Sequence, residues 1–177
     1  MNIHSFARCV GIALLEKGFS VSPLKLQKIL YYQQAWHLVF FSENEHHLNP
    51  LFSEKPQAWI NGPVYPSIFA EYRNSVNGMC EHMGYQHFNV NEENANTELR
   101  RLLNEGLNED EQNLFNQVID LYGSLHQSKL VLMTHSEDPW IIHRGDLGPL
   151  ERSTAEITFE SMYKFYKNRY DRNHNGQ

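Results

Sequence analysis

The residue types that most often carry chemistry are well represented in this chain, which has ten histidines and two cysteines. The group Cys80-Glu81-His82, followed by His87, could supply metal ligands. Its spacing, however, matches neither the paired Cys-x2-Cys nor the His-x3-His pattern of zinc sites. The pair His46-His47 lies in a polar segment, where solvated side chains are the simpler interpretation. We therefore expect no metal ion and no cofactor.

Two other arrangements could support hydrolysis. Cys9 could be a nucleophile, but it falls on the apolar face of a predicted helix, where cysteine is usually an inert small hydrophobe. His135 ends another predicted helix, whose dipole would favour the charged imidazole, and Glu137 or Asp138 could hold it. The same residues could form a structural clamp, in which His135 bonds a last-turn carbonyl and Trp140 folds the loop onto the core. We favour the clamp, expect no catalytic residue, and keep a hydrolase using His135 as a remote alternative.

A short segment centred on Asn61-Gly62 predicts a rigid turn. Asn-Gly favours a tight turn because both residues tolerate positive φ. Pro63 and Pro66 each restrict the residue before them, and Pro66 suits the first position of a following helix. We expect this turn to set the angle between two helices, with Trp59 facing inward as part of the scaffold.

Apolar residues at helical spacing predict the elements that must position these groups. A first helix starts near Ile3, and Gly18 is placed to stop it. Ser22 and Pro23 predict the N-cap and first residue of a second helix that runs to about Phe41. Its apolar arc is wide, which predicts burial on more than one side.

The remaining elements follow from turn signals and caps. Asn108 and Glu111 resemble a capping box at the start of a helix that continues to Leu125. The other predictions are a loop over 42–57, a strand over 57–60, a helix over 66–76, irregular chain over 77–91, helices over 92–104 and 128–135, a loop over 136–150, and a last amphipathic helix from about 158.

These elements predict a mainly α fold. We expect a compact single-domain bundle of about six or seven helices, with at most a small β-hairpin near residues 57–66. Residues 1–170 would form the domain, and residues 171–177 a flexible C-terminal tail.

Composition limits the class of protein. The net charge of −6 argues against a dedicated nucleic-acid binder and is compatible with a basic partner. The basic residues near the C-terminus are then the solvated face of the last helix. The N-terminus lacks the features of a signal peptide, and no run approaches the ~18 apolar residues of a membrane span. We expect a cytoplasmic protein with reduced thiols and no membrane partner.

Three segments together resemble one family. Residues 22–38 resemble the helix signature of the Panacea domain, also called SocA-like antitoxin and often described as phage-associated. Residues 58–68 are similar to its second signature, and residues 121–123 and 132–144 look like its third. The signature positions are Lys25, Leu26, Gln27, Leu30, Trp36, Trp59, Gly62, Pro63, Pro66, Gly123, Thr134, His135, Pro139 and Trp140. The chain departs from the pattern at Gln34, at Asn61 and over residues 80–107.

The resemblance implies a mostly helical domain that neutralises a cognate protein toxin by direct binding, in a type II toxin–antitoxin pair whose toxin is encoded next to it. The alternatives are a proteolytic adaptor that delivers its toxin to an AAA+ protease, and a prophage-encoded anti-defence factor. No catalytic residue is carried over from the family.

Aromatic residues anchor many protein interfaces, so those beside the signatures are the candidates for contacting the partner. The expected partner-binding residues are Tyr31, Tyr32, His37, Asn61 and Tyr65.

Overall fold

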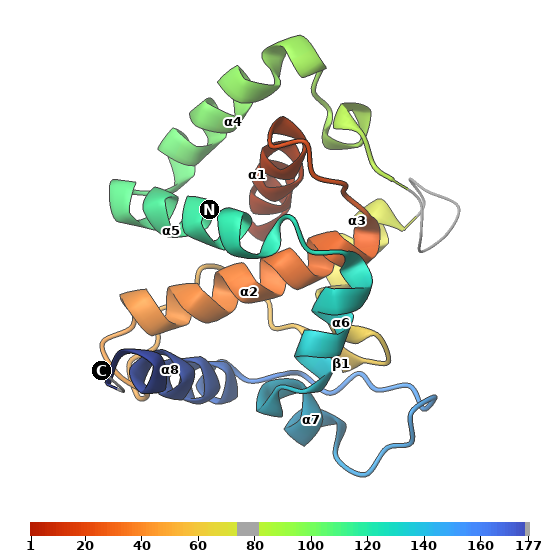
Figure 1. Ribbon diagram of the computed structural model, residues 1–177, viewed down its shortest axis with the longest axis vertical. Helices are drawn as coiled ribbons and strands as arrows, with labels where there is room; N and C mark the ends of the chain where they lie inside the picture. Colours follow the sequence, from red (N-terminus) through yellow and green to blue (C-terminus); the bar gives the residue numbers. More distant parts are fainter. Residues whose placement is uncertain (74–81, 176–177) are drawn as a thin grey trace.

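The computed structural model describes residues 1–73 and 82–175, and it confirms the mainly α fold (Figure 1). The helices are α1 (Ile3–Glu16), α2 (Pro23–Phe41), α3 (Pro66–Tyr72), α4 (Glu92–Gly106), α5 (Glu109–Tyr122), α6 (Gln127–His135), α7 (Asp138–Arg144) and α8 (Phe159–Asn175), with a 3-10 turn, η1 (Tyr85–Phe88). The strands β1 (Gln57–Trp59) and β2 (Gly62–Val64) form an antiparallel hairpin. Within these two ranges, no helix is both long enough and apolar enough to span a bilayer.

Local signals fixed several helix ends. The Ser22 hydroxyl accepts the Lys25 backbone N–H at 3.1 Å and caps α2. Asn108 and Glu111 form the predicted capping box of α5, with reciprocal bonds of 3.0 and 2.9 Å. Gly18 follows α1 with φ of 71°, a conformation that glycine adopts without steric cost.

Helix α2 lies at the centre of the fold. In Figure 1 it crosses the middle of the molecule, with α1, α4 and α5 on one side and α8 on the other. It packs against α1, α3, α5, α6, α8 and β2. Fourteen of its 19 residues are buried, including Lys25, Gln27, Lys28, Gln33 and Gln34. The predicted burial on more than one side is therefore confirmed, and it extends to polar side chains.

Polar side chains of α2 hold the backbone of the other signature segments. Lys28 Nζ donates to the Pro63 carbonyl at 2.8 Å, and Gln27 Oε1 accepts the Tyr65 backbone N–H at 2.8 Å. Lys25 Nζ donates to the Gly123 carbonyl, just beyond α5, at 2.6 Å. Burial lowers the pKa of Lys28 to about 7, because the charged ammonium is costly away from water.

Tryptophan side chains close the hairpin against α3 and α7. The half-buried Trp59 ring meets Phe69 edge-on, with ring centres 4.9 Å apart. Trp140 Nε1 donates to the Trp59 carbonyl at 2.9 Å. The Arg144 guanidinium donates to the Ala58 carbonyl at 3.3 Å. The hairpin is therefore held between α2 and α7, and side chains of both helices hydrogen-bond to its backbone.

The prediction of a loop over 136–150 was wrong for its first half, where α7 forms. Asp138 and Pro139 were interpreted as turn residues, but both also suit the first turn of a helix. Helix α8 reaches Asn175, so the first five residues of the predicted tail are helical, and α4 extends two residues past its predicted end. Val76, the predicted end of α3, lies outside the described residues.

The turn glycine generates a first prediction. Gly62 has φ of 93°, and a Cβ there would lie 2.6 Å from Thr134 Oγ1 and 2.8 Å from Lys28 Cε. Gly18 also has a positive φ, but a Cβ there would meet nothing within 4 Å. We expect Gly18→Ala to lower the free energy of unfolding by about 1–2 kcal/mol and Gly62→Ala by about 1–3 kcal/mol more.

Urea denaturation of the two variants measures this difference. Equal losses in Gly18→Ala and Gly62→Ala would show that the close approach of Lys28 and Thr134 to the turn does not matter for stability.

Candidate functional site

Four of the five expected partner-binding residues lie in the core. Tyr31, Tyr32 and Tyr65 have no exposed surface, and His37 is 3% exposed. The reason is that α2 is covered on every side, so an aromatic stripe along it becomes interior. These four side chains are therefore interior in the folded chain, and their contact with a partner stays a prediction. Asn61, at the hairpin turn, is partly exposed.

The structure places His135 in a clamp, but with other partners than expected. Its ring stacks on Trp140 with ring centres 4.0 Å apart, and it hydrogen-bonds to the Ile60 backbone rather than to a last-turn carbonyl. Burial and the nearby Lys28 lower the pKa of His135 and so favour the neutral imidazole, whereas the helix dipole was expected to favour the charged form. Glu137 turns away from it to bond Tyr166.

Among the described residues, the candidates for a nucleophile and for metal ligands do not form a reactive site either. Burial raises the pKa of the Cys9 thiol to about 12, which keeps it protonated and unreactive. Over residues 1–73 and 82–175, no three His, Cys, Asp or Glu side chains are grouped to hold a metal ion. Cys80 and Glu81 of the sequence group lie outside those ranges.

The other signature residues are divided between the core and its edge. Nine signature residues are buried: Lys25, Leu26, Gln27, Leu30, Gly62, Pro63, Gly123, Thr134 and Pro139. Trp36, Trp59, Pro66 and Trp140 are half-buried. Trp36 Nε1 donates to the Tyr122 hydroxyl at 2.9 Å, and its ring meets Tyr166 edge-on. These side chains pack the fold instead of presenting a contiguous surface.

A buried carboxylate, which the sequence analysis considered only as a partner of His135, joins three elements. Glu137 is 3% exposed. It accepts a hydrogen bond of 2.6 Å from the Tyr166 hydroxyl and pairs with Arg169 at 3.1 Å. The Tyr32 hydroxyl lies 3.4 Å from both of its oxygens. Burial raises the pKa of Glu137 to about 7, although Tyr166 and Arg169 each act to lower it.

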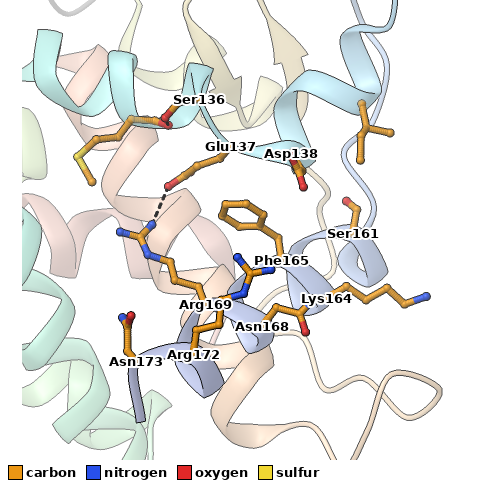
Figure 2. Close-up of a pocket in the computed structure, with 12 residues that line it drawn as sticks. Ser136, Glu137, Asp138, Ser161, Lys164, Phe165, Asn168, Arg169, Arg172 and Asn173 are labelled. Carbon is orange, nitrogen blue, oxygen red and sulfur yellow. Dashed lines mark hydrogen bonds and ion pairs between the residues drawn. The ribbon is translucent and has the colours of Figure 1, made fainter. Parts of the chain in front are cut away.

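Beside this carboxylate, a groove runs between the α6–α7 segment and α8. Its volume is about 620 Å³. Figure 2 shows the two walls, with Glu137 and Asp138 on one side and the side chains of α8 on the other. The lining residues are Met133, Ser136, Glu137, Asp138, Ile142, Ser161, Lys164, Phe165, Asn168, Arg169, Arg172 and Asn173. The α8 wall therefore carries three cations around one aromatic ring.

The composition of the groove suits contact with a protein. Ile142 is 65% exposed, and Phe165 and Met133 are half-buried at its walls. Leu132, next to Met133 in the sequence, is 66% exposed on α6 but does not line the groove. Aromatic, Met and Arg side chains are enriched at protein interfaces, and exposed apolar side chains that cluster mark such sites.

A family model described as "Antitoxin SocA-like, Panacea domain" matches residues 26–141. The chain belongs to this family. The matched part of the Panacea domain contains α2, the hairpin, α6 and the start of α7, while α8 lies beyond it. Searches of curated proteins and of solved structures found no match. Membership favours a protein partner and a non-enzymatic role.

The sequence held a weak signal for the groove. Glu137 precedes Asp138-Pro139, and an acidic residue there was interpreted as a partner of His135. Tyr166 and Arg169, three residues apart on α8, lie on one helical face. Arg169, however, was assigned with the other basic residues to the solvated face of the last helix. Only the tertiary packing of α8 against α7 brings these three side chains together.

The buried carboxylate generates a second prediction. The pKa of Glu137 is about 7 in the folded chain, against about 4.5 when exposed. Below about pH 4.5 both states bind the proton, and between the two values only the folded state does. Its contribution to stability is therefore complete at low pH and is lost as the pH rises through 7.

Relative to the Glu137→Gln variant of the Panacea domain, we expect the wild-type free energy of unfolding to fall by about 3 kcal/mol from pH 4.5 to 7. Denaturant titrations of both proteins across this range measure the difference, and an NMR titration of the Glu137 carboxyl carbon gives its pKa directly. Parallel stability curves, with a carboxyl midpoint below 5, would contradict the assignment.

Proposed function

We propose that this protein is the antitoxin of a type II toxin–antitoxin pair, and that it neutralises a protein toxin by binding it directly in the cytoplasm. The match to the SocA-like antitoxin family carries this proposal. We further propose that the toxin is encoded beside it.

The described side chains support a binding role more than a catalytic one. His135 is stacked on Trp140, Cys9 is buried, and Glu137 is engaged by Tyr166 and Arg169. In these positions the three groups are part of the packed fold. What the groove between α7 and α8 offers is a surface of exposed apolar and cationic side chains.

The third prediction tests the pairing in cells. Each gene that flanks the antitoxin gene is expressed alone and together with it in a heterologous bacterium. We expect one neighbour to arrest growth, co-expression of the antitoxin to restore it, and the two proteins to co-purify. A toxic neighbour whose effect is unchanged and whose product does not co-purify would refute the proposal.

A pulse-chase of the toxin separates direct neutralisation from delivery to an AAA+ protease. Neutralisation by binding leaves the half-life of the toxin unchanged when the antitoxin is present. A shortened half-life that depends on a host AAA+ protease would instead identify the protein as an adaptor.

A further inference from the structure

The charged side chains in the groove between the α6–α7 segment and α8 differ in how far the fold neutralises them. Arg169 is paired with the buried Glu137 at 3.1 Å. Lys164 pairs with Glu45 at 3.1 Å, but both side chains are exposed, and such pairs contribute little. Arg172, on the same wall, forms no ion pair with the described residues (Figure 2). Within residues 1–73 and 82–175, Arg172 is therefore a cation of the groove that no carboxylate pairs with.

Apolar side chains lie on both sides of this cation. Phe165 of α8 is half-buried, and Ile142 of α7 is 65% exposed on the opposite wall. Both walls are helices, so the groove is a channel between helices rather than an open sheet edge. Amphipathic helices bind such channels through apolar side chains at helical spacing.

We infer that the groove binds an amphipathic helix of the toxin whose apolar face carries a flanking acidic residue. The apolar side chains would pack on Phe165 and Ile142, and the carboxylate would pair with Arg172. This inference rests on the proposed function, because it takes the partner to be a protein toxin.

Charge decides between a protein and a nucleic acid as occupant. A phosphate backbone would need a continuous basic surface. Here Asp138 is exposed on the wall opposite Arg172, and the whole chain has a net charge of −6. A helix can place its carboxylate on the side that faces α8 and uncharged residues on the side that faces Asp138.

The fourth prediction uses two matched pairs of variants. Arg172→Glu is compared with Arg100→Glu, which makes the same charge change on the exposed face of α4, on the opposite side of α2 (Figure 1). Ile142→Ser is compared with Leu150→Ser, where the leucine is 86% exposed and does not line the groove. The probe is the growth-arresting toxin that the wild-type antitoxin neutralises.

We expect Arg172→Glu and Ile142→Ser each to weaken toxin binding by roughly ten-fold or more in calorimetry or surface plasmon resonance, and to reduce rescue of growth. The two controls should bind within about two-fold of wild type. Thermal unfolding of all four variants verifies that each is folded, and added salt should weaken wild-type binding more than Arg172→Glu binding.

The outcomes separate the two proposals. If the wild-type protein neutralises and binds the toxin, but the groove variants bind as tightly as their controls, the groove inference is overturned and the antitoxin proposal stands. If the wild-type protein does not bind the toxin, the antitoxin proposal itself fails. Wild-type protein that binds single-stranded or duplex oligonucleotides, with loss in Arg172→Glu, would assign the groove to nucleic acid instead.

Discussion

The structure depends on satisfying polar groups that the sequence places in the middle of its most buried helix. A lysine ammonium and a glutamine amide cannot lie in a protein core without hydrogen-bond partners. In α2 these groups, from Lys28 and Gln27, bind the backbone of the hairpin at Pro63 and Tyr65. These bonds hold the hairpin at the residues that lead directly into α3. Hydrophobic packing alone is more tolerant of rearrangement, so the hydrogen bonds add a directional constraint on how α2 and the hairpin meet.

A second constraint concerns where the acidic and basic side chains lie. The chain is acidic overall, yet the wall of the groove on α8 is basic, and Glu137, which pairs with Arg169 of that wall, is buried. Net charge therefore describes the approach of a partner at long range, whereas the contact is decided by local groups. The sequence-based expectation of a basic partner, which used the net charge alone, does not describe this groove.

Much of the fold was predictable because its signals are local. The cap at Ser22 and the capping box at Asn108 each act within a few residues, and each formed as expected. The hairpin also formed, but its turn residues are Ile60 and Asn61, and Gly62 pairs with Trp59 in the strands. Helix α7 was missed because Pro139 suits both a turn and a helix start, and burial of α7 against the hairpin decides between them. The buried tyrosines and the groove were not predictable. Their environment is created by α8, which follows α2 by more than 100 residues in the sequence.

The hydrogen bonds that hold the hairpin have a consequence for which side chains of such a domain can vary. The bonds from Lys28 and Gln27 end on backbone atoms of Pro63 and Tyr65, and Trp140 likewise binds the Trp59 carbonyl. Backbone atoms are the same whatever side chain a residue carries. These three bonds therefore fix the path of the chain through the hairpin without depending on which side chains stand at positions 59 and 63. Related chains could vary those side chains and keep the same hydrogen-bonded path.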